Sequence, residues 1–290
     1  MLASSASAID IISPAAHCES DTIEIERLLK QLSEVSKEGD GHKAMSRGER
    51  RAYCASLLEG REIDRSALTD SAAKVSLNIH TFTPLSFINT VEALCDAADS
   101  QYPSWRQFAA EYQRLACRRG EEQGFTSLLW LGSEWIADNV YRGNIAELTD
   151  DDNGSVSKTR SLDLMSRHRE RYAPLRNDSV YDRVNMIEMG FRTHKIPYMK
   201  RQSISASDVE REMKPGDVLM LLTNRDGEDI YRIGYVVERD GRRYLMMVDS
   251  DMTLQEGGGT GKVTLSPEPL DRYFKLVAKY FFGYRWLRWK

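Results

Sequence analysis

Apolar residues recur every three or four positions through the first half of the chain, a spacing typical of amphipathic helices. The pattern predicts helices over residues 23–35, 50–58, 104–117 and 133–140. Ser20, Asp21 and Thr22 precede the first of them and are its N-cap candidates. A further helix is expected to begin at Pro84, because the missing N–H of proline costs nothing in a first helical turn.

The period changes after the Lys-Pro-Gly-Asp segment at 214–217, where short apolar runs alternate with turn residues. These runs predict antiparallel strands over residues 218–222, 231–237, 244–248 and 280–289, with turns at 224–227 and 239–241. Helices followed by a meander of strands indicate an α+β fold. A polar, glycine-containing stretch at 38–41 suggests two parts, an N-terminal arm and helix over residues 1–43 and a larger domain over 44–290.

Composition narrows the range of partners. At 290 residues with 41% hydrophobic content, the chain can bury a sizeable core. Its net charge is −4 and it has no basic half, so nucleic acid is not an expected partner. The basic and aromatic tail over 284–290 alternates like a half-buried strand, which we prefer to a nucleic-acid stacking surface. No apolar run reaches the roughly 18 residues of a membrane helix, so no membrane span is expected.

The beginning of the chain, over residues 1–16, is small, apolar and rich in serine and alanine. A secretory signal would open with a basic segment, and none precedes Ile9. We expect a disordered arm, with the remnant of a signal peptide as the alternative. These residues therefore leave the cellular location unknown.

The four cysteines have neither a CxxC spacing nor a histidine at a partnering distance in sequence; they are Cys18, Cys54, Cys95 and Cys117. The sequence accordingly predicts no disulfide framework, no metal site and no cofactor. Cys95 and Cys117 lie in apolar helical contexts, where a free thiol is usually a small core residue.

Several short segments follow one another in an order that carries a resemblance. They are FTPLSFINTV at 82–91, GFTS at 124–127, WIADN at 135–139, LMS at 164–166 with Tyr172, PGDV at 215–218 and RIG at 232–234. The series resembles the N-acetylmuramoyl-L-alanine amidase-like family, the domain of unknown function numbered 1460, which belongs with the NlpC-type bacterial cell-wall peptidases. The resemblance covers residues 44–289. It implies a papain-like core of helices packed on an antiparallel sheet, and a place in the cell envelope or periplasm.

The same resemblance implies that every catalytic position is substituted. Thr83 and Pro84 stand where the family has an Asp-Cys pair, Arg232 stands for the general-base histidine, and Met247 for the orienting histidine. Proline offers no nucleophile, arginine stays protonated, and methionine cannot orient an imidazole by a strong hydrogen bond. The leading hypothesis is therefore a catalytically inactive relative of cell-wall amidases that binds a muropeptide or a protein partner.

Four residues are candidates for binding a ligand: Arg232, Trp130, Trp135 and Asp249. Trp130 falls in the segment that matches an Arg-Leu-His-Tyr run of the family. Arg232 interrupts an apolar strand, so it should have an acidic partner, for which Asp249 and Glu134 are candidates. The pair would be either a structural ion pair or part of a site for a peptide carboxylate.

Two other functions remain open. One is a hydrolase of peptidoglycan-type amide bonds with a rewired nucleophile, Ser86 or Cys54, although Ser86 lies about 200° around the helix from Pro84. Cys95 is too far from Pro84, at about 16 Å along the helix axis. His80 is expected to be a surface histidine. The other function is that of a structural or interaction protein whose former catalytic cavity is filled.

Overall fold

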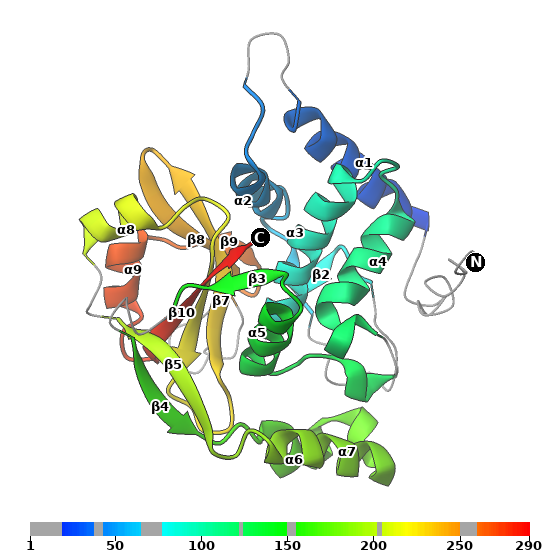
Figure 1. Ribbon diagram of the computed structural model, residues 1–290, viewed down its shortest axis with the longest axis vertical. Helices are drawn as coiled ribbons and strands as arrows, with labels where there is room; N and C mark the ends of the chain where they lie inside the picture. Colours follow the sequence, from blue (N-terminus) through cyan, green and yellow to red (C-terminus); the bar gives the residue numbers. More distant parts are fainter. Residues whose placement is uncertain are drawn as a thin grey trace.

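The computed structural model describes residues 19–37, 43–64, 77–121, 124–149, 155–201, 205–249 and 260–290. In these residues the chain forms an α+β fold, with helices on both faces of an antiparallel sheet (Figure 1). The predicted α+β class, with helices packed on an antiparallel sheet, is confirmed. The predicted arm over 1–16 and the flexible stretch over 38–41 lie outside the described residues.

The predicted helices are confirmed within a few residues. The helices are α1 (Glu19–Val35), α2 (Arg47–Leu57), α3 (Pro84–Asp99), α4 (Trp105–Ala116), α5 (Gly132–Tyr141), α6 (Leu164–Arg167), α7 (Asp178–Met189), α8 (Ala206–Glu212) and α9 (Leu270–Leu276). The N-cap prediction for α1 is wrong, because the helix already includes Ser20, Asp21 and Thr22. Within the described ranges, no helix is long and apolar enough to cross a membrane.

The strands are β1 (Glu62–Ile63), β2 (Thr81–Phe82), β3 (Ile145–Glu147), β4 (Val156–Arg160), β5 (His194–Lys200), β6 (Val218–Thr223), β7 (Ile230–Arg239), β8 (Arg242–Val248), β9 (Val263–Leu265) and β10 (Phe281–Trp289). The main sheet has the order β4-β5-β10-β6-β7-β8-β9, with β3 also paired to β10. All four predicted strands are confirmed as β6, β7, β8 and β10. Asp240 and Gly241, with φ of 51° and 72°, make the predicted turn between β7 and β8.

Each face of the sheet has its own hydrophobic core, because successive side chains of a strand point to opposite faces. Ile233 and Tyr235 of β7 belong to the first core, which is shared with helices α1 to α5. Val236 of β7 and Met247 of β8 belong to the second core, which includes Tyr273 of α9. The sheet therefore separates α3 from α9, and this separation decides which candidate residues can meet.

Helix α1 is part of the first core. Its four apolar stripe residues are buried against the other helices: Ile25, Leu28, Leu29 and Leu32. Its partner α3 lies beside it in Figure 1. The division of the chain at residue 43 stays a prediction, but α1 itself packs as an integral layer of the helical side.

Replacing Glu24 with glutamine is expected to lower the melting temperature at pH 7 and to have little effect near pH 2. Hydrogen bonding from Arg27, and then from Arg61, lowers the pKa of Glu24 from 4.5 to about 2 against the opposing effect of burial. A lowered folded-state pKa gives stability that is complete above about pH 4.5 and is lost as the pH falls toward 2. We expect a loss of about 1–2 kcal/mol at pH 7.

Thermal unfolding of the two proteins between pH 7 and pH 3 measures this effect. Glu26→Gln on the same helix is the control, since Glu26 is exposed. A difference between Glu24→Gln and the unaltered protein that stays constant over this range would contradict the assignment.

Candidate functional site

The start of α3 is fixed by a capping box. Thr83 is the N-cap, and its Oγ1 accepts a hydrogen bond from the Ser86 backbone N–H at 3.1 Å. In return, Ser86 Oγ accepts one from the Thr83 N–H at 2.8 Å. Pro84 occupies the first helical position, as predicted, where its ring suits the helix. The helix start is thus well capped, and a proline ring, which has no nucleophilic side-chain atom, stands where the resemblance places a cysteine.

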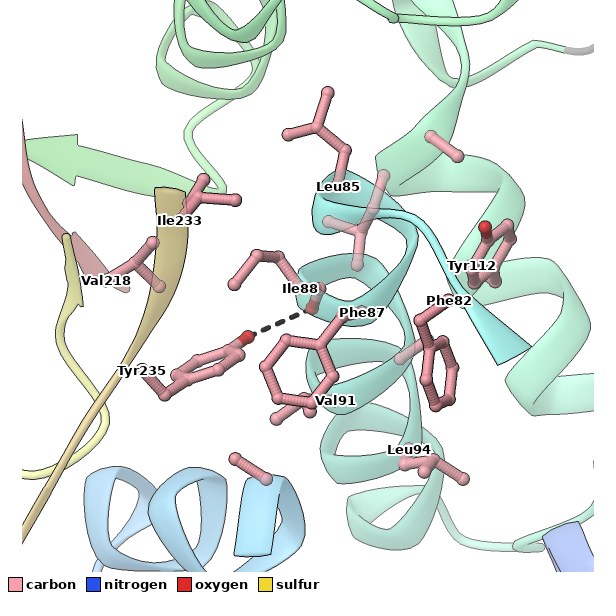
Figure 2. Close-up of a cluster of buried hydrophobic side chains, with 14 of the residues drawn as sticks. Phe82, Leu85, Phe87, Ile88, Val91, Leu94, Tyr112, Val218, Ile233 and Tyr235 are labelled. Carbon is pink, nitrogen blue, oxygen red and sulfur yellow. Dashed lines mark hydrogen bonds between the residues drawn. The ribbon is translucent and has the colours of Figure 1, made fainter. Parts of the chain in front are cut away.

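Most side chains packed around this helix start are apolar. Pro84 and Ile88 are one turn apart and share a face of α3. Leu85 and Ile88 of that turn are buried, as is Ile233 on the strand opposite. Figure 2 shows these three side chains around the helix start, with the Tyr235 hydroxyl donating a hydrogen bond to the Ile88 carbonyl at 3.0 Å. Tyr235 is fully buried, and burial raises its pKa strongly, so it stays a neutral phenol.

Arg232 forms the predicted ion pair with Asp249. Its Nη2 lies 2.5 Å from Asp249 Oδ1, and its side chain is only 4% exposed. The guanidinium also lies over the ring of Tyr231, with 4.5 Å from Cζ to the ring centroid. The other candidate partner, Glu134, pairs instead with Arg118. The guanidinium charge is therefore compensated within the fold.

Met247 lies on the same side of the sheet as this ion pair. It is opposite Gly234 in the β7–β8 register, two residues along each strand from Arg232 and Asp249. The Tyr273 hydroxyl of α9 donates a hydrogen bond to its Sδ at 3.4 Å. Met247 is thus a core residue of the α9 side.

The structure brings Arg232, Met247 and Asp249 together but does not bring them to Pro84. The register of β6 and β7 shifts between Leu221 and Leu222, a bulge at the position of Tyr231. From there the alternation of β7 turns Ile233 toward α3 and leaves Arg232 with the residues of the α9 side. The sheet lies between the two groups.

The two tryptophan candidates differ in exposure. Trp135 is fully buried, and its Nε1 donates a hydrogen bond to Asn89 Oδ1 at 2.9 Å. We therefore correct its predicted role as a ligand-binding residue, because it has no surface to offer. Trp130 is half-buried, stacked on Phe125 with ring centroids 5.7 Å apart, and approached by the Arg118 guanidinium at 5.6 Å.

Other candidate nucleophiles have structural roles. The Ser86 hydroxyl belongs to the cap with Thr83, to whose carbonyl oxygen it also donates a hydrogen bond at 3.2 Å. Cys54 is fully buried between helices. His80 is a surface histidine, as predicted, with its side chain 54% exposed and its Nε2 2.8 Å from Asp21 Oδ1.

In the part of the chain that the structure describes, no group of three or more His, Cys, Asp or Glu side chains is arranged to hold a metal ion.

One cavity escaped the sequence analysis. It has a volume of about 430 Å³ and is lined by the first turn of α2, the 214–217 turn and the end of β10. Arg47 in its wall pairs with Asp96 near the end of α3, at 3.3 Å. Asp96 is about 18 Å along the helix from Pro84, so the cavity is remote from the helix start. Its residues come from four distant segments, Glu238 of β7 included, without a shared motif, and for that reason no local signal could reveal it.

Comparisons with known proteins agree on one group. The family model described as AmiA-like, N-acetylmuramoyl-L-alanine amidase-like, matches residues 53–274. A search of curated proteins found no match. Among solved structures, an N-acetylmuramoyl-L-alanine amidase from Bacteroides uniformis is similar with a TM-score of 0.72 and 21% identity, covering 84% of this chain and 99% of that one.

Two further structures show the same likeness. A Bacteroides fragilis protein proposed to be a xylanase has a TM-score of 0.70 and 23% identity, over 81% of this chain and 99% of its own. A Legionella pneumophila protein assigned to the domain of unknown function numbered 1460 has a TM-score of 0.68 and 13% identity, over 96% and 97%. At these identities the likeness establishes a shared fold.

Proposed function

Because the chain belongs to the N-acetylmuramoyl-L-alanine amidase-like family, we propose that it is a non-catalytic member, which binds its ligand and does not hydrolyse it. The observation that carries this proposal is Pro84 at the first position of α3. An amide hydrolase of the cysteine type needs a thiolate with an imidazole beside it. A proline ring supplies neither a nucleophile nor a proton.

The residues facing the helix start support the same proposal. A general base would have to reach the first turn of α3, where Figure 2 shows Leu85, Ile88 and Ile233, and the Tyr235 hydroxyl bonded to the Ile88 carbonyl. The aliphatic side chains cannot exchange a proton, and burial keeps Tyr235 a neutral phenol by raising its pKa. Arg232 is held by Asp249 on the other side of the sheet. The proposal includes the NlpC-type, papain-like ancestry. It does not include a former triad of Pro84, Arg232 and Met247, because the sheet lies between Pro84 and the other two residues.

The proposed ligand is a peptidoglycan fragment, a muramoyl peptide, with a protein partner as the alternative. Family membership is the support for this ligand class. Trp130 is the candidate contact, because it keeps exposed surface beside Phe125 and Arg118. An aromatic ring next to a guanidinium suits a ligand that has both sugar rings and carboxylates.

Calorimetric titration of the unaltered protein with a purified muramoyl peptide tests the binding proposal. We expect saturable binding that Trp130→Ala weakens about tenfold, which corresponds to the loss of one good aromatic contact. Tyr102→Ala is the matched control, since Tyr102 is an aromatic residue, 77% exposed, in the loop between α3 and α4. No saturable binding, or equal weakening by both variants, would contradict a muropeptide site at Trp130.

Two restoration variants test where the former site lies. Pro84→Cys/Ile233→His introduces the pair on the side of the sheet that faces α3. Pro84→Cys/Arg232→His/Met247→His follows the sequence correspondence. If the former site lies on the side of the sheet that faces α3, only the first variant should have a cysteine that is alkylated faster than an ordinary surface thiol at neutral pH. The reason is that a nearby imidazole favours the thiolate. Faster alkylation in the second variant alone would favour the sequence correspondence.

A further inference from the structure

Two buried thiols lie in neighbouring helices. Cys54 of α2 is fully buried and Cys95 of α3 is 4% exposed, and both are free thiols in this structure. The catalytic argument uses neither of them, and the sequence predicted no disulfide. Their possible pairing follows from how α2 packs on α3.

The register of α2 and α3 is fixed by ion pairs. Arg47 pairs with Asp96, and one turn later Arg51 pairs with Glu92, so the two helices run antiparallel. A second row starts with Arg50, whose Nη2 donates a hydrogen bond to Asp99 Oδ2 at 2.8 Å.

The two cysteines continue that second row. Cys54 follows Arg50 by four residues, and Cys95 precedes Asp99 by four residues. Residues four apart lie above one another on a helix face. The pairing of Arg50 with Asp99 therefore places Cys54 opposite Cys95.

The neighbouring thiol also affects the pKa of Cys95. A hydrogen bond with Cys54 is the first cause that raises the pKa of Cys95, and burial is the second. The Cys95 thiol is consequently protonated at neutral pH. Because both cysteines are buried, they react when the helices open locally or before they close during folding. The third described cysteine, Cys117, is buried at the end of α4 and serves as an internal reference.

We propose that Cys54 and Cys95 form a modification site, a thiol pair that is oxidised to a disulfide bond linking α2 to α3. A small disulfide such as oxidised glutathione is the oxidant. One thiolate attacks it and releases one glutathione thiol, and the second thiolate then attacks the mixed disulfide and releases the other. One Sγ–Sγ bond forms, two protons are lost, and the oxidant gains two electrons.

This bond would fix one wall of the 430 Å³ cavity on α3. Helix α2 contributes that wall and packs closely on the 214–217 turn, where a Cβ added to Gly216 would lie 2.4 Å from the Gly48 carbonyl oxygen. The inference is independent of the proposed function, because the pair lies away from Pro84 and depends only on helix packing.

The test is refolding of the reduced full-length protein in a glutathione redox buffer, followed by alkylation, intact mass measurement and peptide mapping. We expect a mass loss of about 2 Da, a linked pair of peptides containing Cys54 and Cys95, and a melting temperature about 5–10 °C above that of the reduced protein. Cys117→Ser should keep the link, whereas Cys54→Ser and Cys95→Ser should lose it. Mapping on the unaltered protein decides the question even if a variant fails to fold.

Two results would overturn the proposal. One is that both thiols remain alkylatable after refolding in the oxidising buffer. The other is that the link or a glutathione adduct maps to other cysteines, such as Cys18 or Cys117, while Cys54 and Cys95 stay reduced.

Discussion

Replacing Glu92 with leucine is expected to lower the free energy of unfolding by about 3–5 kcal/mol, because it leaves a buried arginine without its counter-charge. Glu92 and Arg51 form a two-pronged ion pair, with N–O distances of 2.5 and 2.7 Å. Their side chains are 3% and 6% exposed. Burial raises the pKa of Glu92, and Arg51 is the main group that opposes this effect. The pair ties α2 to α3 in the centre of the helical layer.

Chemical denaturation of three variants distinguishes the effect of removing the whole ion pair from the effect of removing one of its charges. Arg51→Met/Glu92→Leu should recover most of the loss, because it removes both charges and keeps apolar volume. Arg211→Ala is the matched control from an exposed arginine–carboxylate pair, for which we expect little change in stability. If Glu92→Leu destabilises no more than Arg211→Ala, the ion pair is not the buried link described above.

Replacing Trp135 with alanine is expected to cost about 3–5 kcal/mol of folding stability. The indole is fully buried, meets the ring of Trp289 edge-on with centroids 5.9 Å apart, and hydrogen-bonds to Asn89. Its removal leaves a large cavity and an unsatisfied amide oxygen. Trp130→Ala is the control, with an expected cost below about 2 kcal/mol because that ring is half-buried.

Thermal and denaturant unfolding of both variants checks this contrast. If the Trp130→Ala protein is less stable than the Trp135→Ala protein, the assignment of Trp135 to the core and of Trp130 to the surface is wrong. The comparison also separates loss of ligand binding from loss of fold, which the titration with Trp130→Ala requires.

Local patterns were sufficient to predict much of the fold. The helical stripes of α1, α2 and α4, and the short apolar runs of β6, β7 and β8, were visible because each buries one face or both. The start of α3 at Pro84 followed from the properties of proline alone. Asp249 could be foreseen as the partner of Arg232, since a buried charge needs one.

The elements that were missed have weaker local signals. Strands β4 and β5 carry polar residues on an edge of the sheet, as in Lys158 and Lys195, so they lack a clear apolar period. Helix α7 exposes most of its surface, including Met186 and Met189. The structure of such segments depends on pairing and packing with residues that are distant in the sequence, so a local pattern does not predict it.

The sequence could not predict which candidate residues lie together, for a related reason. A strand residue faces one side of the sheet or the other according to register, and one bulge changes which side. The bulge near Tyr231 places Arg232 with Met247 and Asp249, and leaves Ile233 opposite α3. Trp135 could be recognised as part of a motif, but its burial depends on Asn89 and Trp289, which lie 46 and 154 positions away in the sequence.

The most direct test of the central claim is incubation of the unaltered protein with purified peptidoglycan fragments, followed by mass spectrometry of the products. The Bacteroides uniformis amidase of the same fold is the positive control for the assay. We predict that the muramoyl peptides remain intact with this protein under conditions in which the control releases the peptide from the sugar. Robust cleavage of these fragments by the unaltered protein, which persists when Pro84 is substituted, would contradict the account. It would show that amide hydrolysis does not depend on a nucleophile at the start of α3.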